Sequence, residues 1–296
     1  MRGMPPTFAI PPSFLGITRQ ECSAAFCIAG VPFDLGTTGR AGARDGPRAI
    51  RAASRMLVDG QNPRGWKDVF RLDLADVGDL EIVPGDVPGS LARIGEQAAV
   101  FRHLIALGGD HTITLALLRA AARRHGEPLG LVHFDAHVDT WPDAPGAAPN
   151  HGSVFRHAVE EGLVDPRRLV QIGIRSPVPR DVHQWIVGRG ARVVTAEDVH
   201  LSTPDLVAAA VRDTVGAGPA YLSFDIDALD PSQAPGTGTP EVGGLFTWQA
   251  MGILARLQGI DFVGMDLVEV CPAFDTAEIT ALAGASLVWQ YLGLHA

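Results

Sequence analysis

Short apolar runs recur along the chain, separated by longer segments in which polar residues interrupt the apolar ones. Such runs, bounded by glycine and polar residues, are typical of buried strands. They predict strands at 24–32, 69–77, 104–107, 129–134, 169–174, 193–195, 220–224 and 262–267. The intervening segments predict helices at 47–54, 92–102, 112–124, from about 154, and at 184–188, 204–215, 248–257 and 277–291. Alternating strands and helices predict an α/β fold, a three-layer α/β/α sandwich with a mainly parallel, doubly wound sheet.

The chain has 296 residues and no internal linker, repeat or low-complexity tract. A Pro-rich stretch precedes the first strand, and we expect an irregular N-terminal arm at 1–22. The rest, 23–296, is expected to form a single domain, since single α/β domains of this size are common.

Composition narrows the function classes. A net charge of −9 argues against nucleic acid as a partner, because nucleic-acid binding needs basic surface, and it favours a cationic ligand. The three scattered cysteines favour a reducing cytoplasm over a disulfide scaffold. The N-terminus lacks the apolar core of a signal peptide, and no run approaches the ~18 apolar residues of a membrane span. We expect a cytoplasmic protein with no membrane partner.

Polar motifs follow three of the predicted strands: GGDH at 108–111, DAHVD at 135–139 and SFDID at 223–227. Ligands of open α/β sheets bind outside the carboxyl ends of the strands, so these motifs are expected to meet at one edge. Residues two apart on an extended chain face the same side, which directs the acidic and imidazole groups of each motif into one volume. One such motif alone could be a solvated loop; three in this order predict a metal site.

The ligand types indicate which ion binds. Carboxylates mixed with imidazole, without thiolate, favour a divalent ion such as Mn²⁺ over a structural zinc. The four aspartates of the second and third motifs, Asp135, Asp139, Asp225 and Asp227, carry about −4 of charge, which two divalent cations would neutralise. Without cations, that many carboxylates in one cleft would repel each other, and some would have to protonate.

In their order along the chain, these motifs resemble the ureohydrolases, the family of arginase, agmatinase and related hydrolases of guanidino compounds. The resemblance extends from about Gly30 to the C-terminal helix. Further matching segments are GVPFD at 30–34, GRAGAR at 39–44, DIDALDP at 225–231, PGTGTP at 235–240 and GMDLVEV at 264–270.

The resemblance implies the same fold and two Mn²⁺ per chain. It assigns six ligands: His111, Asp135, Asp139 and Asp225 to one ion, and Asp135, His137, Asp225 and Asp227 to the other, with Asp135 and Asp225 bridging. It also implies that Glu269, at the end of a core strand, binds the guanidinium group as a bidentate pair. His151 is implied as a proton relay, so that His151, Glu269 and Asp139 form the catalytic set. The alternatives are a structural ion pair for Glu269 and a solvated loop position for His151.

The substrate tail is expected to meet the loop 140–150. Arginases hold an amino-acid head group with asparagine and serine in this loop, whereas this chain has Trp141, prolines and alanines there. No basic residue stands in the loop to meet a carboxylate, and Asp143 could meet an amine. With Thr239, these residues are the candidate substrate-binding set.

HGSVF at 151–155 resembles the agmatinase-like branch. The resemblance therefore implies a small cationic guanidino substrate, agmatine, which would be cleaved to putrescine and urea. Guanidinobutyrate or another guanidino acid is the alternative. A homo-oligomer, a trimer or hexamer, is implied by the same resemblance.

Other function classes are less compatible with the sequence. A non-catalytic metal-binding relative would not need every ligand together with Glu269. A dinuclear phosphohydrolase would need basic groups near its ions, and Glu269 would repel phosphate. A nicotinamide cofactor is not expected, because no GxGxxG follows a strand. Ser223 lacks the nucleophile-elbow pattern, and we expect it to support the site through a hydrogen bond.

Overall fold

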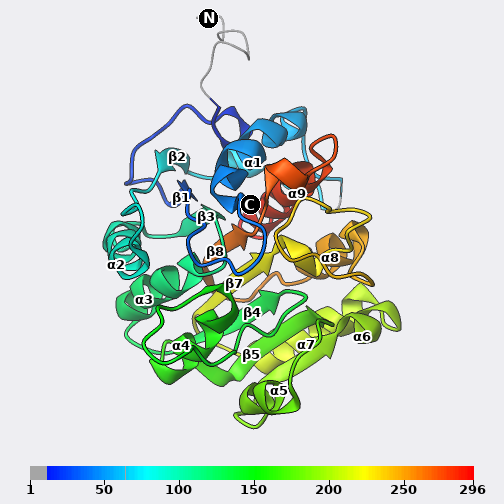
Figure 1. The fold of residues 1–296 in the computed structure, drawn as a ribbon. Helices are drawn as coiled ribbons and strands as arrows, with labels where there is room; N and C mark the ends of the chain where they lie inside the picture. Colours follow the sequence, from blue (N-terminus) through cyan, green and yellow to red (C-terminus); the bar gives the residue numbers. More distant parts are fainter. Residues whose placement is uncertain (1–11, 64) are drawn as a thin grey trace, which may run out of the picture.

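The computed structural model describes residues 12–63 and 65–296. Within them, a parallel eight-stranded sheet forms the centre of the fold, in the order β2-β1-β3-β8-β7-β4-β5-β6 (Figure 1). The strands are β1 Phe26–Val31, β2 Leu74–Asp79, β3 Leu104–Gly108, β4 Leu129–Phe134, β5 Val164–Ile174, β6 Arg192–Thr195, β7 Ala220–Asp225 and β8 Phe262–Val268.

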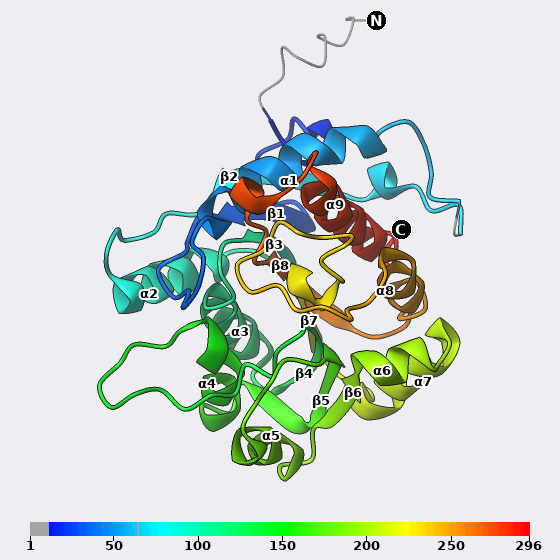
Figure 2. The same ribbon diagram turned by 45° about the vertical axis from the view of Figure 1, so that its right-hand side comes forward.

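Helices pack on both faces of this sheet (Figures 1 and 2). They are α1 Gly46–Ser54, α2 Val87–Ala98, α3 Ile113–His125, α4 Val154–Glu160, α5 Arg180–Val187, α6 Ala196–His200, α7 Pro204–Val215, α8 Thr247–Leu254 and α9 Ile279–Leu292. Apolar side chains of α1, α6, α7, α8 and α9 share one core with the sheet, and those of α2, α3, α4 and α5 share the other. The predicted three-layer α/β/α sandwich is confirmed. No helix in the described ranges is long and apolar enough to cross a membrane.

The strand order brings the sequence motifs together. β3, β8, β7 and β4 are consecutive in the middle of the sheet, although they are far apart in sequence. Phe134 of β4 is in register with Phe224 of β7, so Asp135 and Asp225 leave their strands at the same level. The buried rings of these two phenylalanines stack with centroids 4.8 Å apart, which fixes the two strand ends against each other.

Most predicted strands and helices are present, with shifted ends. The strand predicted at 69–77 is divided: Val69–Arg71 forms a 3-10 turn, and β2 begins only at Leu74. The side chain of Asp68 accepts a hydrogen bond from the Phe70 N–H, which stabilises the turn in place of an extended chain.

Two helices show the limits of the apolar pattern. The helix predicted at 92–102 begins five residues earlier, at Val87, because Asp86 caps it and a proline occupies its first turn. The short helix α6 was not predicted. Its signal is a capping box in which Thr195 and Asp198 exchange hydrogen bonds.

The predicted N-terminal arm is described from residue 12 onward, and 1–11 lie outside the described residues. Phe14 is fully buried in the core, and its N–H donates to Asp76 Oδ2 at 2.7 Å. This part of the arm therefore packs on the sheet. The boundary between arm and domain at 22/23 remains a prediction.

Candidate metal centre and adjoining cavity

Three carboxylates surround His111, which follows β3. Its Nδ1 lies 3.1 Å from Asp139 Oδ2 and 3.2 Å from Asp225 Oδ2. Asp135 Oδ2 lies 3.3 Å from the same nitrogen. Gly109 allows the preceding turn to approach the end of β1, since a Cβ at this position would lie 2.0 Å from the Phe33 carbonyl oxygen.

The far side of the His111 ring is held by a buried hydrogen-bond chain. His111 Nε2 lies 2.8 Å from Ser223 Oγ, and Ser223 donates to Asp266 Oδ1 at 2.6 Å. Because the serine proton goes to Asp266, Ser223 accepts from His111 Nε2–H. The lone pair of His111 is then at Nδ1 and faces the carboxylates. The expected hydrogen-bonding role of Ser223 is confirmed.

A second imidazole lies beside a second carboxylate pair. His137 Nδ1 is 3.0 Å from Asp227 Oδ2 and 3.2 Å from Asp135 Oδ1. Backbone amides hold these acids: the His137 N–H donates to Asp135 Oδ1 at 2.6 Å, and the Ala136 N–H donates to Asp227 Oδ1 at 3.1 Å. Asp135 thus points one oxygen at each imidazole.

The carboxylates of this cluster have strongly displaced pKa values. Burial raises the pKa of Asp225 well above its ordinary value, and the charges of Asp227 and Asp135 raise it further. Burial would also raise the pKa of Asp135, but its contacts with His133, His111 and His137 lower it well below its ordinary range. Without cations, these buried acids compete for protons, as expected of a site that binds positive charge.

The donor set fits divalent metal ions. His111 Nδ1 is fully buried, lies among three carboxylates and has no well-aligned hydrogen bond among the described residues, so positive charge, whether a proton or a metal ion, is favoured there. On both sides of Asp135, imidazole nitrogens and carboxylate oxygens lie within 4.8 Å of one another, close enough to bind one ion together. Such sets suit Mn²⁺ and related ions. The six residues predicted as ligands all lie in this cluster.

Glu269 lies directly behind the cluster, at the end of β8. It is 1% exposed, and its Oε1 accepts the His111 N–H at 2.9 Å. The same oxygen is 3.1 Å from His151 Nδ1. Among the described residues, none donates to Oε2. A Cβ on Gly238 would lie 3.6 Å from Oε2, so the missing side chain leaves space in front of this oxygen.

His151 connects Glu269 to the loop after β1. Its Nε2 is 3.1 Å from the Thr38 amide nitrogen and 2.7 Å from Thr38 Oγ1. Burial would lower the pKa of His151, but the hydrogen bond and charge of Glu269 raise it to about 9. The Thr38 N–H opposes this shift, because a donor facing Nε2 favours the neutral ring.

Two site residues have backbone angles that side chains other than glycine seldom adopt. Asp139 has φ 47° and Glu269 has φ 65°. Such left-handed conformations cost of order 1–3 kcal/mol, and they persist where the surrounding structure enforces them, commonly at functional sites. Here they turn each acid toward the cluster, Glu269 directly after β8 ends and Asp139 five residues after β4 ends.

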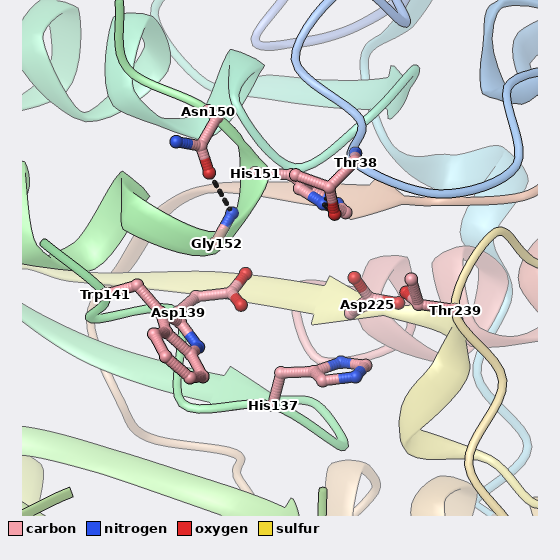
Figure 3. A pocket seen from close by; sticks show the side chains of 9 residues that line it. All are labelled: Thr38, His137, Asp139, Trp141, Asn150, His151, Gly152, Asp225 and Thr239. Atoms are coloured by element: carbon pink, nitrogen blue, oxygen red, sulfur yellow. Dashed lines mark hydrogen bonds between the residues drawn. The ribbon is translucent and has the colours of Figure 1, made fainter. Parts of the chain in front are cut away.

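A cavity of about 390 Å³ opens onto the cluster (Figure 3). It is lined by Thr38, His137, Asp139, Trp141, Asn150, His151, Gly152, Asp225 and Thr239. In Figure 3, the carboxylates of Asp139 and Asp225 point toward each other, with the His137 ring below them and His151 above. The cavity therefore gives access to the cluster at the carboxyl ends of the central strands.

The predicted substrate-binding residues occupy different places. Trp141 lies on the cavity wall and is 38% exposed, and Thr239 lies on the opposite wall, 3.3 Å from Asp227 Oδ2. Asp143 does not line the cavity. Its carboxylate is 2.5 Å from His157 Nε2 and accepts the Asn150 amide at 3.0 Å. The two oxygens of Asp143 are thus engaged by Asn150 and by His157 of α4, and a contact between Asp143 and a substrate amine stays a prediction.

Some site residues were missed at the sequence level. Thr38 falls between two segments of the ureohydrolase resemblance, but nothing local to it indicates contact with His151, 113 positions away. Glu241 follows the Gly-rich stretch, and its Oε1 lies 3.9 Å from His137 Nε2. Its position directly after the matching PGTGTP segment was the available signal.

Comparison with known proteins places the chain in a family. An arginase-family profile matches residues 24–293. The chain is 46% identical to an agmatinase from Photorhabdus laumondii, over 95% of this chain and 91% of that one. It is 47% identical to a guanidinobutyrase from Pseudomonas aeruginosa, over 89% and 84%.

Solved structures agree. A crystal structure of a hypothetical agmatinase from Burkholderia thailandensis superposes with a TM-score of 0.92 at 41% identity, covering 98% of this chain and 92% of that one. Proclavaminate amidino hydrolase from Streptomyces clavuligerus gives 0.91 at 37% identity, covering 98% and 100%. The chain belongs to the arginase family, as its motifs predicted.

Proposed function

We propose that the protein is a manganese-dependent hydrolase that cleaves agmatine to putrescine and urea. The observation that carries the proposal is a cluster of six metal-ligand side chains, three of which (His137, Asp139 and Asp225) line one cavity, with buried Glu269 in contact with the backbone of His111 and with His151. The ligands would hold the ions that activate water for hydrolysis, and a buried carboxylate beside them favours a planar cation as substrate. The agmatinases among its relatives support the same substrate.

The proposed ligands are His111, Asp135, Asp139 and Asp225 for one Mn²⁺, and Asp135, His137, Asp225 and Asp227 for the other. Two divalent cations held by these residues would lower the pKa of a water molecule and so would supply a strong nucleophile near neutral pH. Asp135 is proposed to bridge the ions, supported by its two oxygens lying 3.3 Å from His111 Nδ1 and 3.2 Å from His137 Nδ1.

Glu269 is proposed to bind and orient the guanidinium. Its Oε1 is already held by the His111 N–H, which fixes the carboxylate plane, and Oε2 remains available beside Gly238. A charge-assisted hydrogen bond from a guanidinium N–H would hold the substrate carbon at the cluster. The same carboxylate disfavours anionic groups at this position.

His151 is proposed to hold the proton that the leaving amine needs. An amide anion cannot depart from the carbon, so the nitrogen must be protonated as the C–N bond breaks. His151 lines the cavity, and although burial lowers its pKa and the Thr38 N–H faces Nε2, the hydrogen bond and charge of Glu269 raise the pKa to about 9, which supports a role in proton transfer.

The substrate tail is proposed to extend along Trp141 toward the mouth. The indole can contact the methylene chain and can stabilise a distal ammonium through its π face.

A specific observation favours a second candidate substrate, because the guanidinobutyrase from Pseudomonas aeruginosa is as similar to the chain as the agmatinases are. Guanidinobutyrate is therefore the alternative substrate.

The test is urea release from agmatine, guanidinobutyrate and arginine, with Mn²⁺ added to purified protein. Agmatine should be cleaved better than arginine by at least about tenfold in kcat/KM, a difference of ~1.4 kcal/mol. Preference for guanidinobutyrate would replace the agmatine proposal while leaving the metal chemistry in place. Urea release from none of the three would refute the proposal.

We also propose that 23–296 works as one catalytic domain in a cytoplasmic homo-oligomer, a trimer or hexamer. The proposal is supported by family membership and by apolar side chains such as Trp66 and Trp248, which are 71% and 53% exposed in the isolated chain. Light scattering after gel filtration should give a mass three or six times that of the chain, and a monomeric mass would contradict it.

A further inference from the structure

Two buried polar side chains beside the cluster, His133 and Gln171, are not among the six proposed metal ligands. His133 is on β4 and Gln171 is opposite it on β5, and both are 0% exposed. His133 Nε2 lies 2.7 Å from Asp135 Oδ2, and Gln171 Nε2 lies 3.0 Å from His133 Nδ1. The pair therefore ends on the carboxylate proposed to bridge the two ions.

The hydrogen bonds determine the orientation of the Gln171 amide. Its nitrogen lies 2.7 Å from the Val138 carbonyl oxygen, which can only accept a hydrogen bond. The atom in this position must therefore be the NH₂ group, and its second hydrogen faces His133 Nδ1. A ring nitrogen that accepts at Nδ1 carries its proton at Nε2. His133 consequently donates to Asp135.

This tautomer decides between two roles for His133. Its ring nitrogen lies within ligand distance of the His111 and Asp135 donor atoms, so His133 could be considered a further metal ligand. A nitrogen that bears a proton has no lone pair for a metal. The other ring nitrogen is turned toward Gln171. Its ring also packs on Phe155, with centroids 4.2 Å apart, which restrains any reorientation.

We propose that His133, held by Gln171, is a positioning residue for Asp135. The proposal rests on the proposed metal centre. In it, His133 and Gln171 together fix the plane of the Asp135 carboxylate. The Nε2–H of His133 holds Oδ2 on the His111 side, and the His137 N–H holds Oδ1 on the other side. With both oxygens fixed, the carboxylate is preorganised to bridge. Partners of this kind typically contribute 10- to 100-fold in metal affinity.

The test measures Mn²⁺ binding to the full chain after metal removal. Calorimetric titration gives the number of ions and the dissociation constants, independently of substrate. H133F retains a ring but has no donor, H133Q restores an N–H near the Nε2 position, and Q171L removes the group that selects the tautomer. H103F is the matched control, because His103 is also a buried histidine but contacts Tyr291, away from the cluster.

We expect H133F to bind two Mn²⁺ at saturation with affinity weakened about 10- to 100-fold. H133Q should recover most of that loss, Q171L should show an intermediate loss, and H103F should match the wild type. Two ions bound to H133F with wild-type affinity would overturn the inference. Saturation at one ion would also overturn it, because His133 would then be a ligand. Should H133F fail to fold, wild-type affinity in Q171L decides against the inference.

The same titrations distinguish failure of the proposed metal centre from failure of the positioning role. A wild-type chain that binds no Mn²⁺ would refute the metal centre itself, whatever the variants do. Normal binding by the wild type with unchanged binding by H133F and Q171L would refute only the positioning role.

Discussion

The ligand cluster, with Glu269, is built from side chains at the ends of four adjacent strands, whereas the mouth of the cavity is formed largely by the loop 140–150, which contains no helix or strand. In the cluster, the acids and His111 are buried, His137 is partly exposed, and most of these side chains have two or more partners within the fold. At the mouth, Trp141 and its neighbours are exposed, and the loop is held mainly by its own contacts.

This difference separates the chemistry from the choice of substrate. A rigid sheet edge positions ligands precisely, while a loop can vary without disturbing the strands that carry the ligands. Changes in the cluster should therefore abolish the reaction for every substrate. Changes at the mouth should alter substrate binding by small factors.

The largest effect is expected from D225A. Removing the proposed bridging ligand should lose both ions and lower urea release by more than about 10³-fold, since the ions supply several kcal/mol of transition-state stabilisation. H111A should weaken mainly one ion. Metal analysis and urea release measure both effects, with D213A, an exposed acid on α7, as control. Full metal occupancy in D225A would exclude its bridging role.

A smaller loss is expected from E269Q. The amide keeps an acceptor for the His111 N–H but removes the charge that pairs with a guanidinium. Hydrogen bonds to charged groups contribute ~1.5–3 kcal/mol, so kcat/KM should fall about 10- to 150-fold. Metal content should stay at the wild-type level. Near-normal activity would show that Glu269 has only a structural role.

At the mouth, W141A should weaken agmatine binding modestly. An exposed cation–π contact is worth ~0.5–1 kcal/mol, which corresponds to about two- to fivefold in KM. The effect should be smaller for guanidinobutyrate, whose distal group is an anion. Steady-state kinetics on both substrates measure the difference, and an equal effect on both would assign Trp141 a steric role alone.

The smallest effect is expected from D143N. Asp143 ties the loop to His157 of α4 and to Asn150, so its loss should loosen the mouth without touching the tail. Such partly exposed pairs contribute ~0.2–1 kcal/mol, and KM should rise by no more than about fivefold. The rise should be the same for agmatine and guanidinobutyrate. A rise confined to agmatine would support Asp143 as the amine partner.

The same contrast explains what could be predicted from the sequence. The strand at 129–134 and the helix at 204–215 were predicted with their observed bounds, because apolar runs and a capping residue before a proline are local signals. The ligand motifs were predicted together because each directly follows a strand and parallel strands end at one edge.

Contacts between residues far apart in the sequence had no comparable local signal. The partner of Asp143, His157, lies on α4 and is brought near only when the loop folds back. The contact between Thr38 and His151 joins segments 113 positions apart. The choice of His133 as donor depends on Gln171, a residue of the neighbouring strand. These pairings require the strand order, which local patterns do not provide.

The measurement that tests the account most directly is the Mn²⁺ content of the wild-type chain, compared with its urea release before and after treatment with a chelator. A dinuclear manganese centre should give about two Mn²⁺ per chain, loss of urea release when they are removed, and recovery when they are restored. Unchanged urea release from metal-free protein, or a saturated chain that holds no Mn²⁺, would contradict it.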